Sequence, residues 1–147
     1  MIKTIDLHHD DVMRLVDVWE QSVRDTHDFI TEAMIDAMRP EVHTAFASMD
    51  AVVVYEDHHM ISGFMGVLNQ KVEMLFLDAS ARGHGVGSRL IHYAISEFSV
   101  NRVDVNEQNY QARGFYEHLG FEVYDRSECD DAGRPFPILH MKRSRVV

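Results

Sequence analysis

The chain has 147 residues, of which 46% are hydrophobic and 26% charged, a composition typical of one globular domain, which we expect to span residues 1–147. A net charge of −10 excludes the basic surface that nucleic-acid backbones require, and the single cysteine, Cys129, excludes an intrachain disulfide and a cysteine-based zinc site. Without a signal peptide or a membrane-spanning stretch, the sequence predicts a cytoplasmic protein that binds neither nucleic acid nor membranes.

The N-terminal third of the chain is predicted to be mainly helical. A short strand is expected over Ile2–Asp6, followed by an amphipathic helix over Asp11–Thr26. Its apolar residues recur at helical spacing: Val12, Leu15, Val16, Trp19 and Val23. A second helical stretch begins near Thr31, a good capping residue, and Pro40 is expected to divide it into two short pieces.

The middle of the chain has the pattern of a β-meander. Ala51–Tyr55 and Ile61–Leu68 are rich in β-forming residues and flank the polar turn at 56–59, which predicts a hairpin. After a turn at Asn69-Gln70, Lys71–Leu77 is a third strand. This strand is apolar on both faces except for Glu73, so we expect it in the centre of the sheet.

The C-terminal part alternates between helices and strands. A helix is predicted over 86–98, a strand over Arg102–Val105, and a helix over Asn109–Leu119 that ends at Gly120. Strands over Phe121–Cys129 and Phe136–Met141 flank a turn at 130–134. This order indicates an α/β fold with a mixed sheet.

The glycine-rich segment Arg82–Ser88 lies between a buried strand and a helix. Backbone N–H groups and the positive end of the helix dipole can bind a phosphate there, because glycine allows the tight turn and the close approach. Arg82 adds a charged donor. The segment therefore predicts an anion site.

The phosphate ligand is open to three interpretations. Gly83-x-Gly85-x-x-Ser88 followed by Asp104 resembles a dinucleotide-binding fingerprint, but residues 78–81 intervene after the strand and only about 60 residues follow. A P-loop is a second interpretation, but the sequence has no Gly-Lys-Ser/Thr at the required spacing. A purely structural turn is the third alternative.

Two motifs carry a resemblance to a known family. Arg82-Gly-His-Gly85-Val-Gly87 resembles the pyrophosphate loop of the GNAT superfamily, the Gcn5-related N-acetyltransferases. Asn109-x-x-Ala112-x-x-Phe115-Tyr116 resembles the family's second cofactor-binding helix, and its order along the chain matches. The likeness covers the whole chain and is strongest to small bacterial acetyltransferases of the YjaB type. Ala79 departs from the family, which often has proline there.

The resemblance implies a GNAT acyl-CoA N-acyltransferase fold that binds acetyl-coenzyme A as co-substrate, without a metal. Adjacent histidine pairs, His8-His9 and His58-His59, give no reason to expect a metal, since chain neighbours point in different directions. The implied cofactor contacts are Leu75, Phe76, Leu77, Arg82, Gly83, His84, Gly85, Val86, Gly87, Ser88, Asn109, Ala112 and Tyr116.

The family's chemistry implies a general acid, a general base and a primary amine acceptor. Tyr116 matches the family's acid beside the sulfur. Glu73 is the preferred base, because it is expected to share a strand face with Leu75 and Leu77, where partial burial favours proton uptake; Asp28 and Glu107 are alternatives. A backbone N–H near Leu77 can stabilise the thioester oxyanion.

Acceptor specificity in this family is set by the first helices and the late hairpin. The corresponding residues are Trp19, Ser22, Thr26, His27, Asp28, Phe29 and the turn at 130–137. The implied function is an N-acetyltransferase acting on a protein lysine or a small amine, as a monomer or homodimer. The alternative is a coenzyme A-binding sensor without turnover. The sequence does not identify the acceptor or the acyl-chain length.

Overall fold

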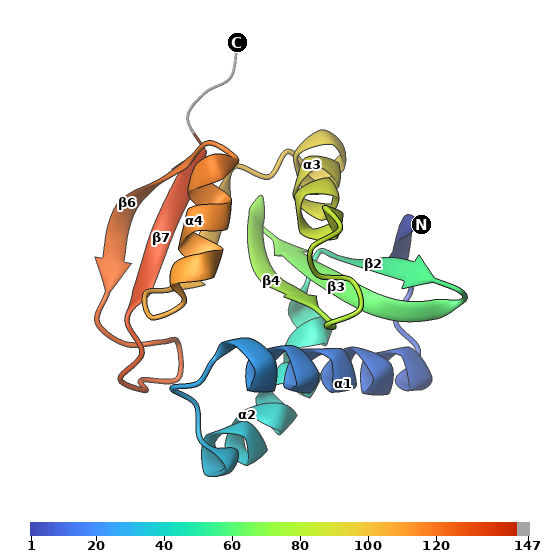
Figure 1. The fold of residues 1–147 in the computed structure, drawn as a ribbon, viewed down its shortest axis with the longest axis horizontal. Coiled ribbons are helices and arrows are strands. Elements are labelled where there is room, and N and C mark those ends of the chain that lie inside the picture. The colour runs from blue at the N-terminus through green and yellow to red at the C-terminus, as the bar shows by residue number, and fades with distance from the viewer. Residues whose placement is uncertain (144–147) are drawn as a thin grey trace.

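The computed structural model describes residues 1–143 and contains a seven-stranded mixed sheet with helices on both faces (Figure 1). The strand order is β1-β2-β3-β4-β5-β7-β6, and among these neighbours only β4 and β5 run parallel. The strands are β1 (Ile2–Ile5), β2 (Ala51–Asp57), β3 (Met60–Leu68), β4 (Lys71–Leu77), β5 (Arg102–Asn106), β6 (Phe121–Ser127) and β7 (Ile138–Arg143). The helices are α1 (His9–Thr26), α2 (Glu32–Ala45), α3 (Val86–Phe98) and α4 (Tyr110–His118), with a short 3-10 helix η1 (Phe46–Ser48). The mixed sheet and the central position of β4 are as predicted.

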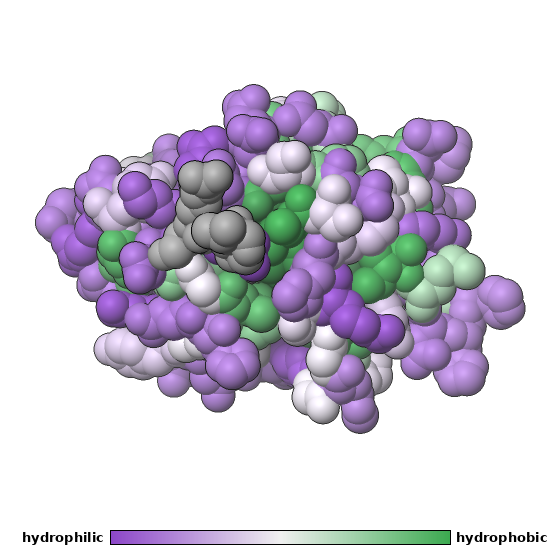
Figure 2. Space-filling view, turned by 90° about the horizontal axis from the view of Figure 1, so that it is seen from above, coloured by the Kyte–Doolittle hydropathy of each residue, from purple (hydrophilic) through white to green (hydrophobic). Residues whose placement is uncertain are grey.

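The sheet separates two apolar clusters. Leu90, Ile91 and Ala94 of α3 and Tyr116 of α4 pack on one face. Leu15 and Trp19 of α1 pack with Ile35 of α2 on the other. In Figure 1, α1 and α2 lie below the first four strands, while α3 and α4 lie on the opposite side. Seen from above, polar residues dominate the surface and apolar ones appear mainly as a strip across its middle (Figure 2).

Helix α2 is continuous through Pro40, so the prediction of two short pieces is wrong. Proline removes one intrahelical hydrogen bond. The apolar stripe of Ile35, Met38 and Val42 nevertheless runs across that position and packs against the core, and this burial favours one uninterrupted helix.

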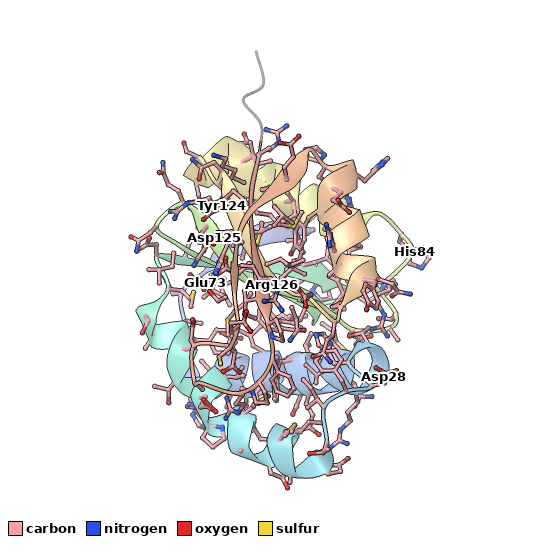
Figure 3. The ribbon with its side chains drawn as sticks, turned by 90° about the vertical axis from the view of Figure 1, so that its left-hand side faces the viewer. Asp28, Glu73, His84, Tyr124, Asp125 and Arg126 are labelled. Atoms are coloured by element: carbon pink, nitrogen blue, oxygen red, sulfur yellow. The ribbon has the colours of Figure 1, made fainter. Side chains whose placement is uncertain are left out.

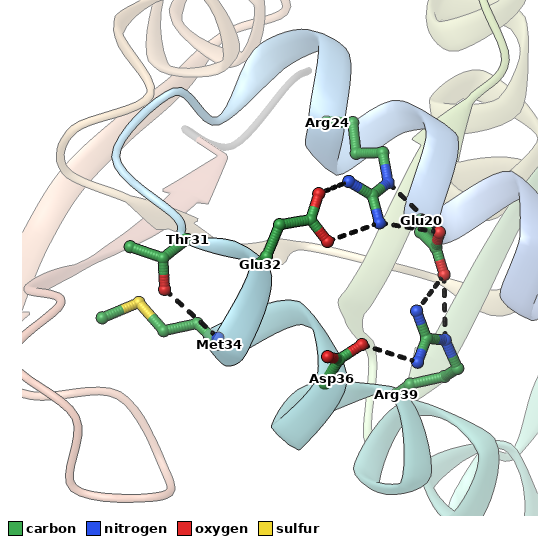
Figure 4. Close-up of polar contacts among 7 residues, drawn as sticks. All are labelled: Glu20, Arg24, Thr31, Glu32, Met34, Asp36 and Arg39. Atoms are coloured by element: carbon green, nitrogen blue, oxygen red, sulfur yellow. Dashed lines mark hydrogen bonds and ion pairs between the residues drawn. The ribbon is translucent and has the colours of Figure 1, made fainter.

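The start of α2 is anchored to α1 by caps and ion pairs (Figure 4). The Thr31 hydroxyl accepts a hydrogen bond from the Met34 amide at 3.3 Å, which confirms the predicted cap. Arg39 of α2 donates to Glu20 of α1, and Arg24 binds both Glu20 and Glu32. The pairs from Arg39 to Glu20 and from Arg24 to Glu32 link α2 to α1 beside their shared apolar cluster.

The two hairpins of the meander close with two-residue turns. His58 and His59 have φ of 51° and 63°, and Asn69 and Gln70 have 52° and 62°. Consecutive left-handed residues are the signature of type I′ turns, whose twist suits a hairpin. The first turn is therefore shorter than the predicted 56–59, and β2 extends to Asp57.

The last hairpin is also shifted from its predicted bounds. β6 ends at Ser127 and β7 begins at Ile138, because Pro135 and Pro137 lack the amide proton that strand pairing needs. In the intervening turn, the Asp130 carboxylate accepts hydrogen bonds from the amides of Ala132 and Arg134. Within residues 1–143 there is no helix long and apolar enough to cross a membrane.

Candidate active site

A cavity of about 540 Å³ opens beside β4, a volume that suits a small-molecule site. Residues from α1, β4, the glycine loop, β5 and α4 line it. They include every predicted cofactor residue except His84: Leu75, Phe76, Leu77, Arg82, Gly83, Gly85, Val86, Gly87, Ser88, Asn109, Ala112 and Tyr116. His84 points outward at the rim of the molecule (Figure 3).

The cavity exists because β4 and β5 separate. Their parallel pairing covers only two positions, Lys71↔Arg102 and Val72↔Val103. From residue 73 to residue 77, the edge of β4 that faces β5 has no strand partner. Its backbone N–H and C=O groups are therefore free to pair with an extended ligand, as an added strand would.

The glycine end of the cavity, residues 82–88, has the geometry of an anion site. Gly83 and Gly85 have φ of 81° and 74°, and a Cβ built on either would meet no atom within 4 Å. Gly85 also caps the N-terminus of α3. This left-handed turn leaves open space beside backbone N–H groups, so the loop fits a phosphate group.

Arg82 stands at the same end with part of its hydrogen-bonding capacity unused. Its Nη2 donates to Asp25 of α1 at 2.8 Å. Its Nη1 is buried and has no hydrogen-bond partner in the structure. A buried unpaired donor is costly, and an anionic ligand would satisfy it.

Helices α3 and α4 approach each other closely at Gly87. A Cβ on this residue would lie 3.2 Å from Cζ of Phe115. Phe115 packs on the α3/α4 cluster and also lines the cavity. Phe115 therefore belongs both to the core and to the cavity wall.

Tyr116 is buried with one side on the cavity. Its ring packs edge-on against Phe115 and Phe121, with centroids 5.1 Å and 5.8 Å away. Burial raises the pKa of the Tyr116 phenol well above its usual range. The phenol therefore stays protonated at neutral pH and can donate a proton or a hydrogen bond.

Glu73 lines the cavity, but not on the predicted strand face. Register against β3 places Val72 opposite Val67 and Met74 opposite Gly66, which leaves Glu73 as the extra residue of a β-bulge. The bulge breaks the alternation on which the prediction depended. Leu75 and Leu77 pack on the α3/α4 cluster, whereas the Glu73 carboxylate lies 2.9 Å from Nζ of Lys71.

A polar network that includes Lys71 and groups from three further strands surrounds Glu73 and Asp104, whose side chains form the carboxylate end of the cavity. Lys71 Nζ also donates to Asp104 Oδ2 at 2.9 Å, and Asp104 Oδ1 lies 2.7 Å from Nδ1 of His140. His140 Nε2 lies 2.6 Å from the Ser127 hydroxyl. Desolvation lowers the pKa of Lys71, but its hydrogen bonds to Asp104 and Glu73 outweigh this and the pKa is raised, so Lys71 stays charged.

A hydrogen-bond chain joins the end of α1 to the start of α4. The Thr26 hydroxyl donates to the Ser22 carbonyl at 2.7 Å, so at 2.7 Å from His27 Nδ1 it acts as acceptor. His27 Nε2 is then an acceptor, which faces the Asn109 amide at 3.5 Å. Burial lowers the pKa of His27 although the charge of Asp28 opposes this, which favours the neutral ring.

The predicted acceptor residues divide into two groups. Ser22, Thr26 and His27 line the cavity. Trp19 does not, because its ring is buried in the α1/α2 core. Asp28 lies at the surface past the end of α1 (Figure 3), and Phe29 packs between His27 and Phe136.

Sequence reasoning missed several residues of the cavity wall: Val72, Met74, Asp104, Val105, Asn106, Gln111 and Phe115. Their membership depends on which strands are neighbours and where these separate. The sequence feature that could have indicated two of them is the position of Asp104 and Asn106 in the short strand that follows α3. Within the described residues, no cluster of three or more His, Cys, Asp or Glu side chains is placed to hold a metal ion.

Comparison with known proteins agrees with this architecture. The family model "Acetyltransferase (GNAT) domain" matches residues 15–144. The peptidyl-lysine N-acetyltransferase YjaB of Escherichia coli is 37% identical over 133 residues, covering 90% of each chain. The solution structure of apo-form YjaB from Escherichia coli superposes with a TM-score of 0.85 at 34% identity over 99% of both chains.

A more distant structure shares the fold alone. The PaiA N-acetyltransferase from Thermoplasma acidophilum, in complex with coenzyme A, has a TM-score of 0.71 at 19% identity and covers 98% of this chain. The chain belongs to the GNAT acetyltransferase family and is an N-acetyltransferase.

Proposed function

We propose that this enzyme transfers the acetyl group of acetyl-coenzyme A directly to a primary amine, and that the amine is the side chain of a protein lysine. The observation that carries the proposal is the cavity itself. It joins an anion-binding glycine end to a carboxylate end through the unpaired edge of β4. A long anionic thioester and a cationic acceptor can meet in such a space.

The residues at the glycine end fit the phosphates of coenzyme A. The backbone at Gly83 and Gly85 borders open space, and the buried Arg82 Nη1 lacks a partner. The pantetheine amides would pair with the free edge of β4 at Leu75–Leu77, while the Asn109 side chain stands where α4 begins. When bound, acetyl-coenzyme A supplies an activated acetyl carbonyl with a thiolate leaving group.

The chain's own residues move the protons. A lysine amine has a pKa near 10.4 and must lose a proton before it attacks. Glu73 accepts that proton at its carboxylate, within reach of the cavity. Tyr116 holds its phenolic proton because its pKa is raised, and it donates this proton to the departing sulfur.

Three observations support an ammonium-bearing acceptor and, among such acceptors, lysine. Two of the three charged cavity-lining side chains, Glu73 and Asp104, are carboxylates. The protein's formal charge of −10 attracts cations. The E. coli relative at 37% identity is named a peptidyl-lysine N-acetyltransferase.

Calorimetric titration followed by an activity assay tests the proposal. We expect the purified chain to bind acetyl-coenzyme A and not NAD. Free thiol should then appear on addition of a lysine peptide, faster than with spermidine or an aminoglycoside. Failure to bind acetyl-coenzyme A contradicts the donor, and thiol release only with the small amines contradicts lysine as the acceptor.

A further inference from the structure

The fork between β4 and β5 carries an arrangement that the proposed chemistry does not require. The last paired residues of the two strands are Val72 and Val103. Glu73 and Asp104 follow them directly, so one carboxylate stands on each side of the point where the strands separate. Both line the cavity.

An ammonium group of the protein itself already occupies the space between these carboxylates. Lys71 Nζ lies 2.9 Å from Glu73 Oε1 and 2.9 Å from Asp104 Oδ2. Lys71, Glu73 and Asp104 have side-chain exposures of 23%, 21% and 20%, so the three are sheltered but still within reach of solvent. Lys71 is not among the residues that line the cavity and reaches the fork only with its flexible side chain.

A neighbouring histidine orients the Asp104 carboxylate at this fork. His140 Nδ1 holds Asp104 Oδ1 at 2.7 Å, which leaves Oδ2 for the ammonium. Two carboxylates against one ammonium leave a net negative charge there. The other charged group of the cavity wall, Arg82, is paired with Asp25 at the glycine end. A second ammonium is therefore attracted to the fork and competes with that of Lys71.

We propose that Glu73 and Asp104 form the seat of the acceptor ammonium, that Asp104 is a specificity-determining residue, and that Lys71 is an internal competitor which the acceptor displaces. This inference rests on the proposed function. It places the acceptor's proton beside Glu73, the group proposed to remove it. A purely structural ion pair between Lys71 and the two carboxylates explains the same distances. It does not predict that the loss of Asp104 and the loss of Lys71 have opposite effects on acceptor binding.

The test compares Asp104→Asn with Lys71→Gln. The probe is Nα-acetyl-L-lysine amide, whose dissociation constant is measured by calorimetry on protein saturated with coenzyme A. Asp104→Asn should raise the constant about tenfold, because a charge-assisted hydrogen bond at a partly exposed site is lost. Lys71→Gln should lower it about threefold, because the competitor is gone.

The two shifts thus have opposite signs. The matched controls are Glu56→Gln and Lys3→Gln, which break the Lys3–Glu56 pair on β1 and β2, also 2.9 Å long with a carboxylate that is 21% exposed. Both should leave the constant unchanged. Asp104→Ser replaces Asp104→Asn if that variant does not fold, with thermal melting and acetyl-coenzyme A affinity as checks.

If Lys71→Gln and Asp104→Asn both weaken probe binding, or if Asp104→Asn leaves it unchanged, the ammonium seat is wrong while the acetyltransferase proposal stands. Wild-type protein that binds acetyl-coenzyme A but neither binds nor acetylates an amine contradicts the proposed function, and this inference with it. Opposite shifts with silent controls support it.

Discussion

The two ends of the cavity are built in different ways. The glycine end comes from one continuous segment, residues 82–88, and acts mainly through its backbone. The carboxylate end is formed by the side chains of Glu73 on β4 and Asp104 on β5, and hydrogen bonds continue from Asp104 to His140 on β7 and Ser127 on β6. Ligand binding at the glycine end should therefore be sensitive to changes of backbone conformation and less sensitive to changes of side chain. Ligand binding at the carboxylate end should instead be sensitive to side-chain substitutions.

The largest effect is expected where side-chain chemistry carries the reaction. Tyr116→Phe removes the proposed acid but keeps the ring that packs on Phe115 and Phe121. We expect kcat to fall about 100-fold, a typical contribution of general acid catalysis, with acetyl-coenzyme A affinity retained. Steady-state thiol release and calorimetry separate the two quantities.

The matched control for this variant lies on the same helix. Tyr110 is the first residue of α4, is 79% exposed and does not line the cavity. Tyr110→Phe should leave kcat unchanged. Wild-type turnover in Tyr116→Phe would remove this tyrosine from the mechanism.

The difference between one continuous segment and side chains gathered from several strands also explains which features could be predicted from the sequence. Helix α3 and strand β4 were predicted with their correct bounds, because glycines and apolar periodicity act within one short segment. The place of Asp104 in the cavity wall and the bulge at Glu73 were missed. Both depend on strand order and register, which no local pattern specifies. Pro40 was misjudged for a related reason, since tertiary packing outweighed its helix-breaking tendency.

At the glycine end, the next prediction concerns backbone conformation. Gly85→Ala should weaken acetyl-coenzyme A binding about tenfold, because a Cβ enters the open space beside the amides. Calorimetry measures the affinity. Because φ is 74° at this position, the alanine substitution should also lower the free energy of unfolding by about 1 kcal/mol.

Gly133→Ala separates these two consequences. Gly133 has φ of 79°, also has no atom within 4 Å of a built Cβ, and lies in the late turn outside the cavity wall. It should show the same loss of stability with unchanged affinity. Equal weakening of binding in both variants would show that strain, not the open phosphate space, accounts for the effect.

The smallest effect is expected at His27, whose hydrogen bonds link the end of α1 to the start of α4. Because burial lowers the pKa of His27, the unfolded chain binds more protons than the folded one below about pH 6.5, the ordinary value for histidine. The contribution of His27 to stability is thus complete above pH 6.5 and is lost as the pH falls through its lowered folded pKa. Protonation would also place a donor at Nε2 opposite the Asn109 amide.

His27→Gln keeps an acceptor near the Nε2 position but cannot titrate. Between pH 7 and pH 5 we expect the wild-type melting temperature to fall further than that of His27→Gln, by a few degrees at most. His92→Gln, at an exposed position of α3, should follow the wild type. Parallel melting curves for His27→Gln and wild type would mean that the ring is not held neutral, and the hydrogen-bond chain from Ser22 to Asn109 would then lack its assigned direction.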